Sequence, residues 1–110
     1  MAKSAFLNTK VKRGISDFLE ALRKRNIRVN KAFLFGSYAK GNSREDSDID
    51  IAVFSSQFGK DRTSEMMFLR RIALSIDSHI EPIPFSPSDL DEKYSTLIQE
   101  IRKHGILIKH

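Results

Sequence analysis

The stretch "LFGSYAKGNSREDSDIDIAVF", residues 34–54, places two glycines, a serine and several acidic residues between two apolar segments. Residues 31–35 form a short apolar burst that stops at Gly36, and residues 48–55 alternate before they become apolar throughout. Both patterns predict strands. Gly36 and Gly41 leave room between them for about one helical turn. The stretch therefore predicts a strand, a tight glycine turn and a second strand.

Apolar spacing outside this stretch predicts the other elements. Apolar positions in residues 4–25 and again in residues 63–76 recur at helical intervals, so both segments are predicted to be helices. Residues 80–85 are predicted to form a third strand, and the two prolines within it favour a sheet edge or a strand end.

A final helix is predicted after the third strand. Ser86 suits the N-cap, Pro87 the first helical position and Asp89 the acidic position of a capping box. This helix is expected to run to about His104 and to end at Gly105 in the left-handed conformation, before three last apolar residues. The order helix, strand, turn, strand, helix, strand, helix predicts an α/β (α+β) fold, with helices packed on a small mixed sheet.

Length and composition limit the function classes. With 110 residues, the chain is expected to form a single domain over residues 1–110. It has no cysteine, which excludes disulfides and thiolate metal sites. No apolar run is long enough to span a bilayer and nothing near Met1 resembles a secretion signal, so no membrane association and a cytoplasmic location are expected.

The net charge of +5 comes from 19 basic and 14 acidic residues, with an excess of basic residues in the first third of the chain. Such a surface could attract nucleic acid, a nucleotide or an acidic protein. Without interleaved aromatic residues or a known nucleic-acid motif, a solvated helix face is the favoured interpretation, and a nucleic-acid partner is not expected. The basic residues concerned are Lys10, Lys12, Arg13, Arg23, Lys24, Arg25, Arg28 and Lys31.

The glycine turn and the acidic residues suit phosphate and metal binding. A glycine at Gly36 lets a bulky group approach the backbone, and exposed amides with the Ser37 hydroxyl can hold an anion. Asp48 and Asp50 are two residues apart on a strand, so both side chains point to one face and repel each other. A hard cation such as Mg²⁺, which completes its coordination with water and substrate phosphates, would relieve this repulsion.

The connections between the strands bring a third carboxylate to the same place. If Gly36 and Asp48 are neighbours, their two strands must be antiparallel. The following helix and third strand then form a right-handed parallel crossover, which puts the start of the third strand, Glu81, close to Asp48. Turn and carboxylates are expected to meet at one edge of the sheet.

This arrangement resembles a known family. Gly36 and Ser37, ten further residues, and then Asp48 and Asp50 separated by one residue are similar to the G-S-x(10)-D-x-D signature of the nucleotidyltransferase superfamily that includes DNA polymerase beta. The segments "FGSYAKG" and "SDIDIAV", together with the short chain, resemble its minimal nucleotidyltransferase branch. The resemblance covers nearly the whole chain in order and length.

The resemblance implies a nucleotidyltransferase fold and a role for each matched residue. Gly36 and Ser37 would hold the triphosphate of a nucleotide, and Asp48 and Asp50 would bind two Mg²⁺ ions. Glu81 would be the third carboxylate, which takes part in metal binding and helps to activate the acceptor. The family usually has aspartate there, in a strand rich in Val, Ile and Leu, whereas Glu81 is followed by a proline.

Two basic residues near the turn have two interpretations. Lys40 and Arg44 could contact nucleotide phosphates, with Lys40 the candidate within the turn, or both could be surface residues of a loop. The motif residues themselves also have a plainer interpretation, because a glycine can simply end a strand and an acidic cluster can simply protect a sheet edge. Their joint spacing favours the functional interpretation.

The function implied by the resemblance is Mg²⁺-dependent transfer of a nucleoside monophosphate, with AMP from ATP as the expected case, to an acceptor hydroxyl. Minimal nucleotidyltransferases resemble the antitoxin half of a two-gene system, so the resemblance implies a tyrosine of a HEPN-type toxin as the acceptor. The alternative is an antitoxin-like interaction protein that binds its partner and nucleotide without turnover. A basic nucleic-acid-binding domain is the third hypothesis.

Overall fold

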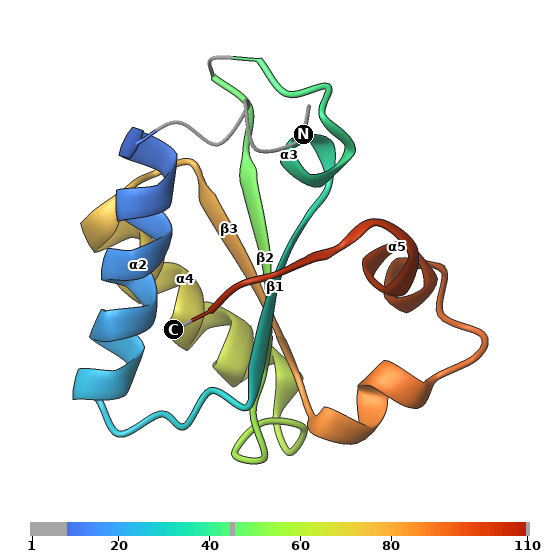
Figure 1. Cartoon of the computed structure of the whole chain (residues 1–110). Helices are drawn as coiled ribbons and strands as arrows, with labels where there is room; N and C mark the ends of the chain where they lie inside the picture. The colour runs from blue at the N-terminus through green and yellow to red at the C-terminus, as the bar shows by residue number, and fades with distance from the viewer. Residues whose placement is uncertain (1–8, 45, 110) are drawn as a thin grey trace.

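The computed structural model describes residues 9–44 and 46–109. The chain forms a four-stranded mixed sheet, in the order β3-β2-β1-β4, with helices on both faces (Figure 1). The elements in chain order are α2 (Thr9–Lys24), β1 (Lys31–Phe35), α3 (Ser37–Lys40), β2 (Ile49–Phe54), α4 (Arg62–Ile76), β3 (Ile80–Phe85), the 3₁₀ helix η1 (Pro87–Asp91), α5 (Thr96–His104) and β4 (Ile106–Leu107).

The pairing of the strands confirms the predicted topology. β1 and β2 are antiparallel, with Phe35 opposite Asp50. β2 and β3 are parallel, with Asp50 beside Glu81. The glycine turn after β1, the start of β2 and the start of β3 therefore meet at one end of the sheet.

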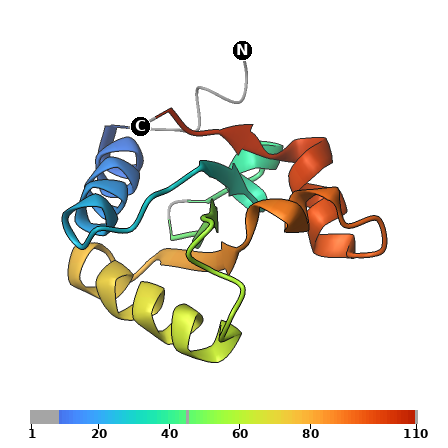
Figure 2. The same cartoon turned by 90° about the horizontal axis from the view of Figure 1, so that it is seen from below.

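One face of the sheet is covered by α2 and α4 (Figure 2). The apolar stripe predicted from sequence is the buried side of α2, and β2 directs alternate residues against the two helices. Burial of such stripes is the main source of stability for helices of this length. The buried residues on this face include Ile15, Phe18, Leu19 and Leu22 of α2, Ile49, Ile51 and Val53 of β2, and Leu69, Ile72 and Ala73 of α4.

The opposite face carries a smaller core beneath α5. Ile98 and Ile101 of α5 pack on aromatic residues of three strands. The rings of Phe54 and Phe85 are stacked with their centroids 5.0 Å apart, and Phe33 meets Phe54 edge to face at 5.7 Å. Because alternate strand residues share a face, Asp48 and Asp50 lie on this α5 side.

β3 lies at the edge of the sheet, which confirms the expectation from its two prolines. The carbonyl oxygens of His79 and Phe85 accept hydrogen bonds from Ile49 and Ser55 at 2.7 and 2.9 Å. Odd-numbered residues of β3 therefore direct their backbone toward β2, and even-numbered residues direct theirs away from the sheet. Pro82 and Pro84 occupy even positions, where β2 requires no donor.

The last predicted helix was wrong in its extent. The capping acid is present, since Asp89 accepts a hydrogen bond from the Ser86 amide at 2.8 Å, but it begins only η1. The chain then becomes extended, and α5 starts at a second cap, where Ser95 Oγ accepts from the Ile98 amide at 3.1 Å. Two N-caps, at Ser86 and Ser95, thus divide the segment that was predicted to form one helix.

Gly105 ends α5 as expected, but not in the left-handed conformation. Its φ of −63° is open to any residue. The glycine is required for another reason, since a Cβ there would lie 2.3 Å from the Ile101 carbonyl oxygen. The apolar residues that follow form β4, a strand that the sequence did not predict, and Ile106 pairs with Leu34 of β1.

The first helix begins within the described residues at Thr9, so the predicted part before it, residues 4–8, lies outside them. Across residues 9–44 and 46–109, no helix combines the length and the hydropathy that crossing a membrane requires.

Candidate functional site

The turn after β1 is in close contact with the carboxylate of β2. Gly36 has φ 74° and ψ −150°, a conformation that favours glycine. A Cβ at this position would lie 2.1 Å from Asp50 Oδ2, so no larger residue fits without displacing the carboxylate. The glycine and the aspartate of the motif are thus neighbours in space, although 13 residues separate them in the sequence.

The two glycines of the motif bracket the single helical turn α3, as predicted from their spacing. The first intrahelical bond joins the Lys40 amide to the Gly36 carbonyl oxygen at 3.1 Å. The amides that precede Lys40 in α3 have no intrahelical acceptor, which is general for the first turn of a helix. Ser37 is half-buried at the start of this turn. Together these donors can bind an anion.

The two aspartates stand at the start of β2. Asp48 is exposed and immediately precedes the strand, while Asp50 is half-buried within it. Burial, and then the negative charges of Asp48, Glu81 and Glu100, raise the pKa of Asp50 to about 6. A carboxylate in such surroundings lacks a compensating positive charge, which a bound cation would supply.

The third predicted carboxylate, Glu81, lies beside Asp50 in the register of the sheet but has its own partner. Arg70 of α4 donates to it through Nη1 at 2.7 Å to Oε1 and through Nη2 at 3.4 Å to Oε2. Because β3 is the edge strand, the long side chain of Arg70 can reach round the sheet to this residue. The sequence did not predict this ion pair.

A second acidic residue near Asp50 was also not predicted. Glu100 of α5 is close enough to contribute to the raised pKa of Asp50, and its Oε2 lies 3.5 Å from Lys40 Nζ. Lys40, the basic residue proposed for phosphate binding, is therefore paired across the site with α5. Capping signals predicted a helix that includes Glu100, but no motif indicated what its polar side would face.

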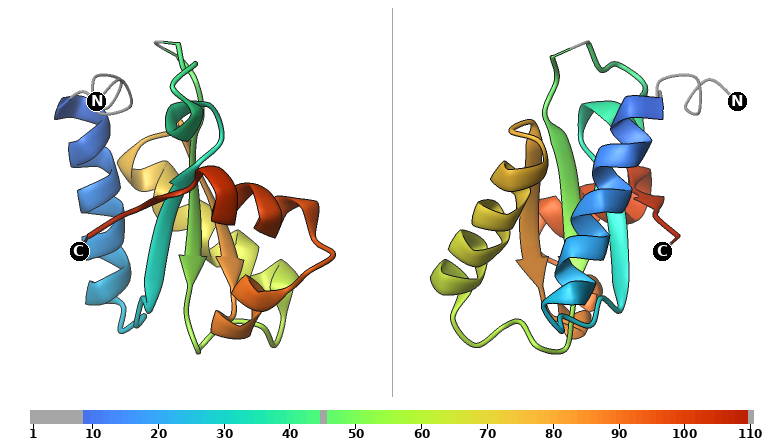
Figure 3. Two further views of the ribbon diagram at one scale, coloured as in Figure 1. Left: turned by 45° about the vertical axis from the view of Figure 1, so that its right-hand side comes forward. Right: turned by 90° about the vertical axis from the view of Figure 1, so that its left-hand side faces the viewer.

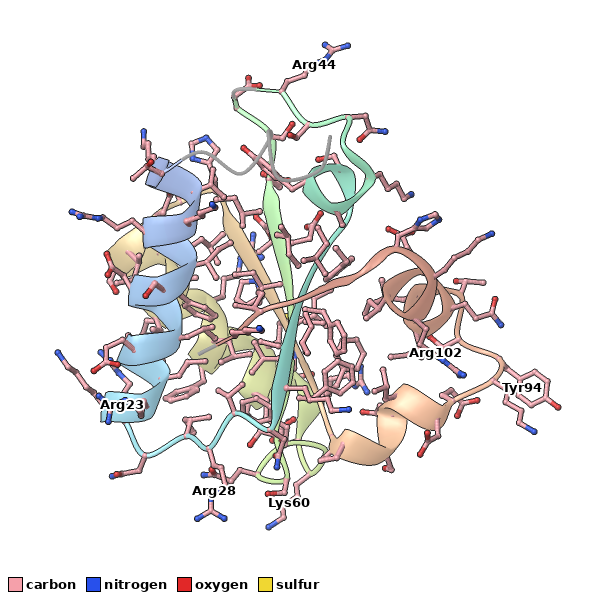
Figure 4. All side chains as sticks on the ribbon, viewed as in Figure 1. Arg23, Arg28, Arg44, Lys60, Tyr94 and Arg102 are labelled. Carbon is pink, nitrogen blue, oxygen red and sulfur yellow. The ribbon has the colours of Figure 1, made fainter. Side chains whose placement is uncertain are left out.

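Arg44, the second basic residue considered from sequence, is not part of this cluster. Arg44 is exposed at the tip of the loop before β2, where Figure 4 shows its side chain directed away from the protein. His79 is exposed, and its Nδ1 lies 2.9 Å from Asp77 Oδ1 in the turn before β3.

The donor set fits a hard divalent cation held by two carboxylates. Mg²⁺ binds few protein carboxylates and keeps water and substrate phosphates in its shell, which matches the paired Asp48 and Asp50. Among residues 9–44 and 46–109, no three histidine, aspartate or glutamate side chains are grouped as a complete metal site. In the structure, Glu81 is engaged with Arg70 instead.

Comparison with known proteins is consistent with this geometry. The chain is 28% identical over 87 residues to the protein adenylyltransferase MntA of Shewanella oneidensis, covering 79% of this chain and 58% of that protein. A relative from Methanocaldococcus jannaschii is 48% identical over 42 residues, and the match covers only 42% of its length. The chain thus spans between two fifths and three fifths of these curated relatives.

Solved structures show the same fold. A crystal structure of a toxin-antitoxin with AMP-PNP has a TM-score of 0.61 and 26% identity, covering 87% of this chain and 70% of that one. A crystal structure of a toxin-antitoxin MntA-HpeT mutant has a TM-score of 0.60 and 25% identity, with coverages of 86% and 70%.

The family assignment rests on the match to a family model. Residues 18–110 match the family described as Polymerase beta, Nucleotidyltransferase, and this range contains the glycine turn and all three predicted carboxylates. The resemblance inferred from the motif is confirmed, and the chain belongs to the polymerase beta-type nucleotidyltransferase family.

Proposed function

We propose that this protein is a Mg²⁺-dependent protein adenylyltransferase that acts in the cytoplasm. It transfers AMP from ATP to a tyrosine hydroxyl of a HEPN-type partner. The observation that carries the proposal is the contact between Gly36 and Asp50, because it joins an anion-binding turn to a carboxylate whose neighbours leave it short of positive charge.

Each residue of the site has a role in this reaction. The turn amides and Ser37 bind the phosphates, and Lys40 adds positive charge when it leaves Glu100. Asp48 and Asp50 would hold Mg²⁺, which neutralises the charge that develops on the leaving group. The protein contributes mainly by positioning the reactants.

The bonds exchanged follow from the product. The acceptor oxygen forms a bond to the α-phosphorus of ATP, and the bond between that phosphorus and the bridging oxygen breaks. Pyrophosphate leaves with the electron pair of the broken bond. The acceptor proton passes to a base, for which Glu81 is the candidate if Arg70 releases it.

Two similarities support the choice of nucleotide and partner. The Shewanella oneidensis relative is named as a protein adenylyltransferase, and one similar structure is a toxin-antitoxin with AMP-PNP. Both support an adenine nucleotide as the substrate, and the name of the relative supports a protein acceptor. A tyrosine of a HEPN-type protein is our specific proposal for the acceptor.

The proposal is tested with ATP labelled at its α-phosphate, Mg²⁺ and the HEPN-type protein from the same genome. Label should appear on a tyrosine of that protein, and Asp48→Asn and Asp50→Asn should each abolish it. Asp17→Asn, an exposed change on α2, is the matched control and should transfer label like the wild type. An unlabelled partner, with nucleotide binding confirmed by calorimetry, overturns the proposal.

A second function is favoured by one observation. Arg70 occupies the carboxylate of Glu81, so the third carboxylate is engaged and not free. An interaction protein that binds its partner and nucleotide without turnover does not need a free carboxylate as a catalytic base. It would form the complex without labelling it, and the complex would be unaffected by Glu81→Gln.

A further inference from the structure

A groove of about 550 Å³ lies between α2, β1 and the C-terminal strand β4. Figure 1 shows the C-terminal segment running from α5 across β1 toward α2. This segment forms one wall of the groove. Its volume is within the range of ligand-binding sites. Nothing in the proposed reaction uses this feature.

The floor of the groove is aliphatic. Ile15 and Leu19 of α2, Leu34 of β1 and Ile106 of β4 all line it. Ile108, which follows β4 and packs against the core on the α2 side, also lines the groove. A contiguous apolar surface marks a binding site more often than scattered apolar residues do.

The rim of the groove is basic. Lys12, Arg23, Arg28 and Lys109 line it together with one carboxylate, Glu20. Glu20 is already paired with Arg23. Lys12, Arg28 and Lys109 are exposed, and within residues 9–44 and 46–109 none of these three has a carboxylate in ion-pair contact. The rim is therefore available to negatively charged groups from outside the described chain.

We propose that the groove docks an amphipathic helix of a protein partner, with aliphatic side chains on one face and flanking carboxylates. The aliphatic floor would take the apolar anchors, which recur at helical spacing in this mode of recognition. The basic rim would pair with the carboxylates and favour acidic segments. Nucleic acid suits this surface less well, since the groove lining has no aromatic side chain on which a base could stack.

The groove and the carboxylate site lie on opposite faces of the sheet. Figure 3 shows the two helices that cover these faces, α2 on the side of the groove and α5 on the other side. Leu34 faces the groove, whereas Phe35, the next residue, is opposite Asp50 on the α5 side. A helix in the groove would leave the nucleotide turn open. The inference extends the proposed function, on which it rests for the existence of a protein partner, by separating the docking surface from the reaction site.

The test uses model peptides and the full chain, without nucleotide or Mg²⁺. One peptide carries leucines at helical spacing with glutamates at the flanking positions, and a control peptide has lysines in place of the glutamates. Binding is followed by fluorescence anisotropy, and the contact surface by amide NMR shifts. The glutamate peptide should bind and shift Leu19 and Ile106, while the lysine peptide should bind at least about tenfold more weakly.

Two pairs of residues give matched variants. Ile108→Glu, at an aliphatic residue of the groove, should weaken binding of the glutamate peptide at least about tenfold, while Leu74→Glu, at a leucine of α4 that is 61% exposed, should not. Arg28→Glu should weaken it similarly, and Arg102→Glu on α5 should not; Figure 4 shows both arginines. If Ile108→Glu lowers the melting temperature, the Arg28 pair still decides the question.

Three results would overturn the inference. These are equal binding of both peptides, no binding by the glutamate peptide, and displacement of that peptide by a mixed-sequence RNA that shifts the same amides. The last result would assign the groove to nucleic acid. Peptide binding by a protein that transfers no AMP would overturn the enzymatic proposal alone, whereas AMP transfer without peptide binding would overturn the groove alone.

Discussion

Arg70 holds Glu81 by both carboxylate oxygens, with the shorter contact, Nη1 to Oε1, at 2.7 Å. The Arg70 side chain is 52% exposed and that of Glu81 30% exposed, so the pair contributes at most about 1 kcal/mol to stability. Its larger effect is on local charge. Arg70, which is not part of the sequence motif, neutralises Glu81, one of the acidic residues around Asp50.

Removing this arginine should strengthen cation binding. Arg70→Gln leaves Glu81 unpaired beside Asp50, and one more uncompensated charge at a half-exposed site is worth about 1 kcal/mol, or roughly fivefold in affinity. Titration calorimetry with Mn²⁺ measures it. Arg71→Gln, at the adjacent exposed arginine, should leave the affinity unchanged. Equal affinities for wild type and Arg70→Gln would show that Glu81 does not act on the cation.

Glu81→Gln separates catalysis from binding. In the proposed function, nucleotide binding depends mainly on the Gly36 turn and the two aspartates, so it should be nearly unchanged. If Glu81 accepts the acceptor proton, the rate of AMP transfer should fall by at least about a hundredfold. Single-turnover transfer of labelled AMP measures this. Equal rates for the wild type and Glu81→Gln would exclude Glu81 as the base.

Ser37→Ala should weaken nucleotide binding without affecting the fold. The change removes one donor from the proposed anion site, which is otherwise built of backbone amides. Loss of a hydrogen bond to a charged group costs about 1.5 to 3 kcal/mol, or roughly ten- to a hundredfold in affinity. Calorimetry with a non-hydrolysable ATP analogue and Mg²⁺ gives the value. An unchanged affinity would remove Ser37 from the site.

Asp50→Asn should stabilise the metal-free protein near neutral pH. The pKa of Asp50 is raised from 3.8 to about 6, so the folded state binds its proton more tightly than the unfolded state does. This contribution is fully present below about pH 4 and is lost as the pH rises through about 6. With a discount for solvent screening it amounts to about 1 kcal/mol, or roughly 4 °C in melting temperature.

Melting curves from pH 4 to pH 8 with a chelator test the sign. The wild type should lose stability relative to Asp50→Asn across this range, and saturating Mg²⁺ should reduce the difference. A mutant that is less stable than the wild type at pH 7.5 would show that Asp50 has a structural role.

Gly36→Ala should reduce both stability and nucleotide binding. The substitution strains a residue with φ 74° and forces Cβ against Asp50 Oδ2, so a loss of more than about 1 kcal/mol is expected in urea unfolding. Gly14→Ala in α2 is the control. Its Cβ would have ordinary contacts of 3.8 and 3.9 Å, so it should stabilise the helix by about 0.5 to 1 kcal/mol. Equal effects at both positions would contradict the close contact at Gly36.

Most of the strand topology could be predicted from the motif. Once Gly36 and Asp48 are required to be neighbours, β1 and β2 must be antiparallel, and a right-handed crossover brings Glu81 close to them. In the structure the aspartate that contacts Gly36 and lies beside Glu81 is Asp50, two residues further along the strand. Local patterns then gave five elements to within a few residues. The capping acid Asp89 was also predicted correctly, because its partner, the Ser86 amide, is local in sequence.

What the sequence did not predict depends on contacts between distant segments. Arg70 is one of two adjacent arginines in α4, and only the edge position of β3 brings it within reach of Glu81. Glu100 faces Lys40 because α5 covers the second face of the sheet. Strand β4 is only two residues long, and it forms by pairing with β1, so its own sequence carries little signal.

The two prolines of β3 protect one edge of the sheet against aggregation. The outward-facing residues between Glu81 and Phe85 are Pro82 and Pro84, and neither has a backbone N–H to offer another chain. This edge of the sheet therefore cannot act as a template for strand addition, which is the first step of many aggregation processes. A further strand could therefore pair only with the opposite edge of the sheet. That edge is β4, which is two residues long.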